Sequence, residues 1–251
     1  MKKPGTIILM IAGILLILGL NYAFFTGKLM GLSPEVKAAL KSDDLVEVFE
    51  EKGGKLLVFQ PTAAEPRLGL ILYPEGRMDM HTYAYPARLM AEEGYLVVYL
   101  SRRAQTDFDI EGENERIQAV MADYPDISTW VVGGHTWGCN FAAYFAATYP
   151  ERVAGVVLWA PRFDPPVDLS GSELPVLAIY GTRDEENTGF LADVEPLLPA
   201  QTEWQVIEGG NRVGYASFGP MAADVGATIP ETTQQEMAVE YTLDFLDQIT
   251  E

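Results

Sequence analysis

Apolar and β-branched residues recur along the chain in short runs, each bounded by turn-forming residues, from residue 45 onward. The first two runs, Leu45–Phe49 and Lys55–Gln60, are separated by Lys52-Gly53-Gly54, and this spacing predicts an antiparallel hairpin. The later runs are continuously apolar, as expected of strands that are covered on both faces. They are Leu68–Tyr73, Tyr95–Leu100, Thr129–Gly133, Val153–Trp159, Val176–Tyr180 and Gln205–Ile207.

Segments with helical periodicity alternate with these runs. The last one is predicted to start near Thr232, to end near Ile249, and to begin with a capping box formed by Thr233 and Glu236. The alternation predicts an α/β fold with a mostly parallel central sheet and helices on both faces. In such sheets the active site forms at the carboxyl ends of the strands. The other predicted helices are Tyr83–Glu93, Glu113–Ala122, Asn140–Thr148 and Leu191–Leu198.

A stretch of 21 uncharged residues, Gly5–Phe25, precedes this pattern. As a helix it would be about 30 Å long, enough to cross a membrane. It is longer than the apolar core of a cleaved signal peptide, usually about 7–15 residues, and no convincing cleavage site follows. We therefore expect a single-pass anchor over residues 1–25, a tether over 26–44 with a short helix at Pro34–Lys41, and one domain over 45–251. Because Lys2 and Lys3 precede the apolar stretch, the domain is expected outside the cytoplasm, at the cell membrane.

The chain is strongly acidic, with 36 Asp and Glu residues against 17 Lys and Arg residues and a net charge of −19. Such a surface repels phosphate backbones, which argues against nucleic acid as a partner. Cys139 is the only cysteine, so no intrachain disulfide can form. With His81 and His135 as the only histidines, a zinc site is not expected either. The sequence predicts no metal and no cofactor.

Gly134-His135-Thr136-Trp137-Gly138 lies between a predicted strand and a predicted helix. This is the setting of the G-x-S-x-G nucleophile elbow, in which a tight turn presents a hydroxyl at the edge of the sheet. The two glycines permit a turn in which a Cβ atom would collide with its neighbours. Here the central residue is Thr136 rather than serine.

With this motif and others in matching order from about Leu68 to the C-terminus, the chain resembles the bacterial fold-5 family of α/β hydrolases. The resemblance implies an α/β-hydrolase fold and hydrolysis of an ester or related acyl bond through an acyl-enzyme. Because the connection Arg162–Pro175 is short, we expect no lid domain and an open pocket. The resemblance rests on Tyr73-Pro74-Glu75-Gly76, which is similar to the family's Tyr-Pro-Gly-Gly oxyanion loop, and on Ala91–Val98, Tyr180-Gly181-Thr182-Arg183-Asp184, Glu208-Gly209-Gly210-Asn211, Phe218-Gly219-Pro220 and Ala227-Thr228-Ile229.

Carried across by position, the resemblance assigns Thr136 to the nucleophile, Asp184 to the acid and Arg212 to the base, where the family has histidine. An arginine stays protonated and has no acceptor lone pair, so it cannot take a proton from a hydroxyl. Thr136 is β-branched, which suits the strained backbone of an elbow poorly. We expect Arg212 to form an ion pair with Asp184, or else to bind a carboxylate or phosphate.

The oxyanion hole uses backbone N–H groups, so it can survive changes of side chain. By resemblance its donors are the amides of Trp137 and of a residue at Gly76–Arg77. His81 follows this loop and is the alternative candidate for a base. His135 and Cys139 flank the elbow, and both are expected to have structural roles.

Three readings of function follow. The preferred one is a hydrolase-fold protein that is inactive or weakly active, because the serine and histidine positions hold Thr136 and Arg212. The second is an active hydrolase that uses Thr136 with a non-standard base such as His81 or with an activated water. The third is a non-catalytic protein, either one that binds a small anionic ligand or a surface protein with no ligand.

Overall fold

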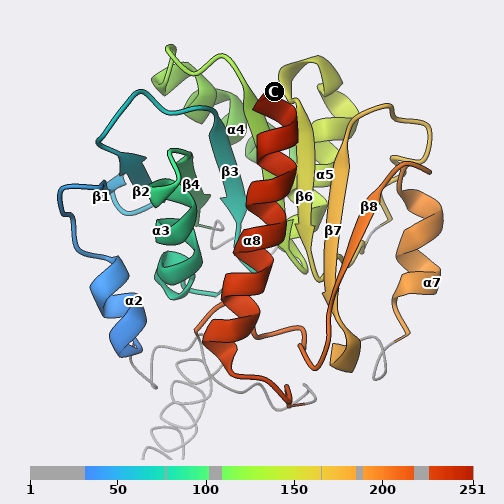
Figure 1. Ribbon diagram of the computed structural model, residues 1–251. Helices are drawn as coiled ribbons and strands as arrows, with labels where there is room; N and C mark the ends of the chain where they lie inside the picture. Colours follow the sequence, from blue (N-terminus) through green and yellow to red (C-terminus); the bar gives the residue numbers. More distant parts are fainter. Residues whose placement is uncertain are drawn as a thin grey trace, which may run out of the picture.

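An eight-stranded sheet runs through the molecule (Figure 1). The computed structural model describes residues 32–76, 78–101, 109–164, 166–184, 189–217 and 226–250. Along the sheet the strands follow the order β1-β2-β4-β3-β5-β6-β7-β8. β1 pairs antiparallel with β2, β2 pairs antiparallel with β4, and all other neighbours are parallel. The strands are β1 Val46–Glu51, β2 Leu56–Pro61, β3 Gly69–Tyr73, β4 Leu96–Leu100, β5 Trp130–His135, β6 Gly155–Trp159, β7 Val176–Gly181 and β8 Glu203–Ile207.

The strand order reverses around β3. Strand β4 is added on one side of β3, and the chain then returns to place β5 on the other side. In open α/β sheets such a switch point is where ligands bind, outside the carboxyl ends of the strands. Tyr73 at the end of β3 pairs in register with Gly134 of β5, so the loops that follow these two strands lie side by side.

Helices cover both faces of the sheet (Figure 1). On one face lie α2 (Pro34–Ala39), α3 (Ala84–Glu92) and α8 (Glu231–Thr250), which share a core with alternate residues of the strands. On the other face lie α4 (Ile110–Asp123), α5 (Gly138–Thr148) and α7 (Leu191–Val194). Strands β3, β4 and β6 are buried along their whole length because helices cover both of their faces. Three short 3₁₀ helices complete the described elements: η1 (Met80–Tyr83), η2 (Pro150–Arg152) and η3 (Glu195–Leu197).

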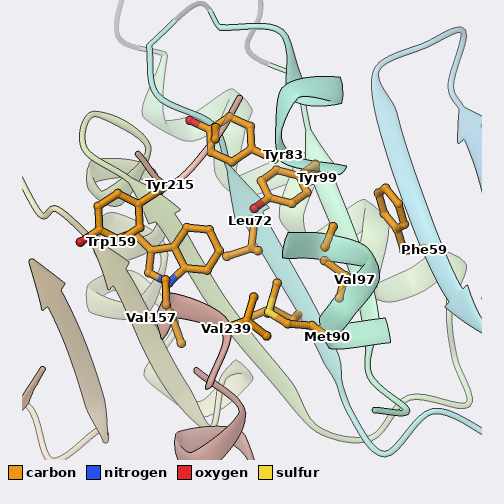
Figure 2. Packing of buried hydrophobic residues seen from close by; sticks show 14 of the residues in the cluster. Phe59, Leu72, Tyr83, Met90, Val97, Tyr99, Val157, Trp159, Tyr215 and Val239 are labelled. Atoms are coloured by element: carbon orange, nitrogen blue, oxygen red, sulfur yellow. The ribbon is translucent and has the colours of Figure 1, made fainter. Parts of the chain in front are cut away.

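Large aromatic side chains fill the core near the carboxyl ends of the strands (Figure 2). Tyr83 packs against Tyr99 with ring centroids 5.1 Å apart, and Trp159 stacks on Tyr215 at 5.8 Å. The hydroxyl of Tyr99 is buried without a hydrogen-bond partner. The core thus carries polar phenol groups directly beneath the region where the site is expected.

The predicted strands and the α/β class are confirmed, including the antiparallel hairpin of β1 and β2 and the short helix α2 in the tether. The helix predicted over 191–198 is interrupted, because Pro196 cannot donate to an α-helical ladder and a 3₁₀ turn replaces it. Helix α8 begins at Glu231, so the capping box predicted at Thr233 and Glu236 is wrong. Both residues lie inside the helix, and the Glu236 carboxylate accepts a hydrogen bond from Tyr85 instead.

The connection from β6 to β7 covers residues 160–175 and contains no helix or strand in its described part, in agreement with the expected absence of a lid domain. The predicted anchor, residues 5–25, and residues 26–31 of the tether lie outside the described part of the chain. No helix among the described residues has the length and apolar character needed to cross a membrane.

Candidate functional site

A tight turn between β5 and α5 carries Thr136, as the motif predicts. The backbone of Thr136 has φ +50°, a conformation that β-branched residues rarely adopt. A Cβ added to Gly134 would lie 2.3 Å from the carbonyl carbon of Gly138, and one added to Gly138 would lie 2.4 Å from the carbonyl oxygen of Tyr73. Both glycines are therefore required by the close approach of α5 to β3 and β5. The chain retains the geometry of a nucleophile elbow.

The Thr136 side chain is 1% exposed, and its hydroxyl oxygen is buried without a hydrogen-bond partner. A strained backbone of this kind typically costs about 1–3 kcal/mol and persists where the surroundings over-determine it. Here the Thr136 N–H donates to the carbonyl of Trp159 at 2.8 Å, which holds the turn against β6. The turn is thus maintained although its hydroxyl has no base bound to it.

The acid position, Asp184, follows β7 and is buried. Its loop is fastened to the loop that carries the base position. The Arg183 N–H donates to the carbonyl of Gly210 at 2.9 Å, and the Gly209 N–H donates to the Thr182 hydroxyl at 2.9 Å. A Cβ added to Gly181 would lie 2.2 Å from the Gly210 carbonyl oxygen, so these two loops are in close backbone contact.

The base position, Arg212, lies in a turn that α8 holds in place. Gln234 of α8 accepts from the Asn211 N–H at 3.0 Å and donates to the Asn211 carbonyl at 2.6 Å, and the Asn211 side chain accepts from the Gly214 N–H. The Arg212 Nε atom is buried without a hydrogen-bond partner. The expected ion pair is not formed, since none of the ion pairs among the described residues joins Arg212 to Asp184.

His135 ties three loops of the site together. Its Nε2 lies 2.6 Å from the Arg212 carbonyl, which can only accept, so Nε2 carries the proton and donates. Its Nδ1 then accepts from the Tyr83 hydroxyl at 2.7 Å, and that hydroxyl accepts from the Glu75 N–H at 2.8 Å. Burial lowers the pKa of His135 to about 3. His135 is therefore a neutral structural residue, as expected from its place below the elbow.

His81, the alternative candidate for a base, lies between two carboxylates. Its Nδ1 lies 2.5 Å from the Asp79 carboxylate and its Nε2 lies 2.9 Å from the Glu50 carboxylate. The hydrogen bond to Asp79 chiefly, and that to Glu50, raise the pKa of His81 to about 9. At neutral pH both nitrogens carry protons and both donate, so no lone pair remains for a substrate or for Thr136. These contacts argue against the assignment of His81 as a base, because the surrounding carboxylates favour its protonated form.

Comparison with known proteins decides the family. A sequence model of the alpha/beta hydrolase family matches residues 69–236, which run from β3 into α8. The chain belongs to the alpha/beta hydrolase family. A search of curated proteins gives no match to this chain.

Many solved structures share the fold of this alpha/beta hydrolase. A predicted CIB-like hydrolase from Thermoplasma acidophilum is 18% identical, with a TM-score of 0.57, over 80% of this chain and 96% of that one. A dienelactone hydrolase from Anabaena variabilis is also 18% identical at TM-score 0.57, over 80% of this chain and 97% of that one. A membrane phospholipase A described as a bacterial virulence factor is 16% identical at TM-score 0.57, over 97% of this chain and 96% of that one. At these identities the likeness concerns the fold.

The oxyanion loop of this alpha/beta hydrolase holds a carboxylate that the sequence motif did not reveal. Glu75 is 9% exposed, and its Oε2 is buried without a hydrogen-bond partner. Burial raises the pKa of the Glu75 carboxyl. The Arg212 guanidinium and the Thr136 hydroxyl lower this pKa, and the Asp184 carboxylate raises it further. Hydrogen bonds through Tyr83 and His135 join the Glu75 N–H to the Arg212 carbonyl, so the loops that carry Glu75, Thr136 and Arg212 converge. The Thr136 hydroxyl oxygen and the Glu75 Oε2 atom are both buried, and neither has a hydrogen-bond partner.

Glu75 was missed because Tyr73-Pro74-Glu75-Gly76 was interpreted as a backbone motif only. The available signal was a charged residue at the first glycine of the Tyr-Pro-Gly-Gly pattern that it resembles. Gly76 has φ +47°, a left-handed conformation that suits glycine, so the turn of the loop is kept. Trp137 stands at the N-cap of α5, where an N–H points out of the helix, in the place expected of an oxyanion donor. The second donor is expected at Gly76 or Arg77, and Arg77 lies outside the described residues.

Cys139 has the structural role expected of it. The residue is completely buried, and its thiol donates to the Gly134 carbonyl at 3.1 Å. Burial raises the pKa of the Cys139 thiol far above its ordinary value, so it does not supply a thiolate nucleophile.

Proposed function

We propose that this alpha/beta hydrolase is a membrane-anchored protein that retains an ester-directed site but has lost histidine-assisted acyl transfer. Its ester hydrolysis is then weak or absent. The observation that carries the proposal is the state of the proton acceptors around Thr136. Arg212 holds the base position, the buried His135 is a very weak base with its Nδ1 occupied, and His81 is protonated.

The nucleophile position supports the same proposal. A triad works as one unit, in which the base removes the hydroxyl proton as the hydroxyl attacks. The Thr136 hydroxyl is buried and has no histidine within hydrogen-bond distance. An internal threonine also lacks the free terminal amine that activates known threonine nucleophiles. What remains is an elbow and an oxyanion loop, which alone can retain roughly 10³–10⁴-fold catalysis over water.

Esters are the substrate class that we assign to the site. The family membership and the similar folds of a dienelactone hydrolase and of an esterase from Pyrobaculum calidifontis support this class. No feature of the described residues favours a particular acyl or alcohol group.

The test compares the wild type with Thr136→Ala on short p-nitrophenyl esters, together with labelling by a fluorophosphonate probe. We expect no labelling, and hydrolysis that is slow and unchanged by Thr136→Ala, because residual catalysis comes from the oxyanion region and not from a nucleophile. Gly171→Ala is the matched control, since nothing lies within 4 Å of a Cβ added there. If the wild type is labelled at Thr136 and turns over at about 1 s⁻¹ or faster, and Thr136→Ala abolishes both, the proposal is wrong.

Membrane anchoring is proposed from the sequence. Gly5–Phe25 has the length of a spanning helix, and Lys2 and Lys3 favour a cytoplasmic N-terminus. The domain should therefore lie outside the cytoplasm. Protease added to intact spheroplasts should digest the domain and leave an N-terminal fragment in the membrane fraction. A domain that is digested only after the membrane is lysed would reverse the orientation, and recovery of the intact chain in the soluble fraction would refute the anchor.

A further inference from the structure

We infer that Glu75 is an internal ligand of the oxyanion site: its carboxylate takes the place beside Thr136 and Arg212 that the acyl oxygen of a substrate would occupy. The chain thus fills its own site. This inference deepens the proposed function, because it names the group that keeps an ester away from the elbow. It also identifies Glu75 as a third substitution, beside Thr136 and Arg212, that separates this site from hydrolysis.

The position of Glu75 is set by the backbone. Tyr73 pairs with Gly134 at the ends of β3 and β5, so the loop that begins at Pro74 lies against the elbow. A Cβ on Gly138 would lie 2.8 Å from the Pro74 carbonyl oxygen, which shows how closely the loop approaches the start of α5. The Glu75 N–H is fixed by its 2.8 Å bond to the Tyr83 hydroxyl.

The direction of the side chain follows from its burial. Glu75 is 9% exposed, so its carboxylate points into the molecule rather than into solvent. A buried charge requires a partner of opposite charge or hydrogen-bond donors. Tyr83 and His135 join the Glu75 N–H to the Arg212 carbonyl, and the Arg212 Nε atom is itself buried without a hydrogen-bond partner. Two groups of opposite sign, each with a buried polar atom that has no partner, thus lie on converging loops beside the elbow, and the attraction of Arg212 lowers the pKa of the Glu75 carboxyl against the effect of burial.

This arrangement is the reverse of what acyl transfer needs. An oxyanion hole stabilises negative charge that develops on the substrate oxygen. A carboxylate in that space excludes the substrate oxygen and repels the charge that develops on it. Loss of one oxyanion donor typically lowers kcat by about 10²–10³-fold, so occupation of the site should lower it at least as much.

The first experiment asks whether the space vacated by Glu75 binds a small carboxylate. Melting temperatures of the wild type, Glu75→Gly and Glu75→Gly/Arg212→Met are measured in sodium formate and in sodium chloride at equal ionic strength. We expect a saturable increase of the melting temperature with formate, relative to chloride, in Glu75→Gly alone. In the wild type Glu75 already occupies the site, and the double variant lacks the Arg212 cation that would bind formate. Glu75→Ala replaces Glu75→Gly if the glycine variant does not fold.

Equal responses of the wild type and the Glu75 variants to formate would overturn the inference, as would the absence of a formate effect in both Glu75→Gly and Glu75→Ala. A formate effect that persists without Arg212 would also contradict it, because the anion would then bind elsewhere. This titration needs no enzymatic activity, so its result is independent of the proposed loss of hydrolysis.

The second experiment measures hydrolysis of p-nitrophenyl acetate by Thr136→Ser/Arg212→His with and without Glu75→Gly. We expect the triple variant to exceed the double variant by about 10²-fold or more. A triple variant no faster than the double variant would refute occupation of the oxyanion site. Glu75→Gln in the wild-type background tests the opposite role, because a loss of wild-type hydrolysis there would make the carboxylate a base and overturn the inference. Efficient, Thr136-dependent turnover by the wild type would refute both the proposed function and the occupation of the site, whereas a failed formate titration would refute the occupation alone.

Discussion

Replacing Tyr83 with phenylalanine should destabilise the fold strongly, because its hydroxyl joins three loops of the site. The hydroxyl accepts from the Glu75 N–H at 2.8 Å and donates to His135 Nδ1 at 2.7 Å. Tyr83→Phe leaves both partners in place without a partner of their own, in a region where Tyr83 itself is fully buried. A buried donor or acceptor left unsatisfied costs about 1–3 kcal/mol. Because a phenyl ring is easier to bury than a phenol, we expect a net loss of roughly 2–4 kcal/mol.

Tyr99→Phe is the matched control. Tyr99 is equally buried, and its ring packs against Tyr83 with centroids 5.1 Å apart, but its hydroxyl has no hydrogen-bond partner. Removing that hydroxyl should leave the free energy of unfolding unchanged or increase it slightly. Figure 2 shows the two rings side by side in the same cluster, so the variants differ in hydrogen bonding and not in packing.

The assay is urea denaturation of both variants and of the wild type, followed by tryptophan fluorescence and far-UV circular dichroism. The difference between the variants should be roughly 2–4 kcal/mol, or about 5–15 °C in melting temperature for a domain of this size. If Tyr83→Phe and Tyr99→Phe are equally stable, the chain of hydrogen bonds through His135 does not contribute to the stability of the site, and the reasoning from these contacts fails.

Three further outcomes follow from the same structure. Two carboxylates bind the protonated form of His81, so its contribution to stability should be fully present below pH 6.5 and lost as the pH rises through about 9. In urea titrations, His81→Gln should therefore lower the free energy of unfolding by about 1–2 kcal/mol at pH 6 and by little at pH 10. His135 has its folded pKa lowered to about 3, so stability should fall as the pH drops from 6.5 toward 3, by on the order of 3 kcal/mol at pH 4, and His135→Phe should flatten this slope. Gly181→Ala would place a Cβ 2.2 Å from a backbone oxygen, so it should lower the melting temperature by roughly 5 °C or more, whereas Gly171→Ala should not. Equal effects of the two glycine variants would contradict the close approach of the acid and base loops.

The sequence by itself determined the strands, the α/β class and the elbow. Each follows from neighbours along the chain: continuous apolar runs for covered strands, glycines at Gly134 and Gly138 for a tight turn. The order of motifs along the chain also allowed positions 136, 184 and 212 to be assigned to the nucleophile, the acid and the base by resemblance. The predicted bounds of helices failed in two places. Pro196 interrupts the helix predicted over 191–198, and α8 begins at Glu231 without the predicted capping box.

Only the tertiary structure decided what those residues do to one another. Whether His81 is a base depends on Glu50 and Asp79, and Glu50 contacts it from strand β1, 31 positions earlier in the sequence. None of the ion pairs among the described residues joins Arg212 to Asp184, although the motif order alone favoured the acid as its partner. Burial holds His135 neutral, and it outweighs the opposing effect of a hydrogen bond to a carbonyl 77 positions away in the sequence. Charge states depend on distances through space and on the exclusion of water, and neither can be predicted from the order of residues along a strand or helix.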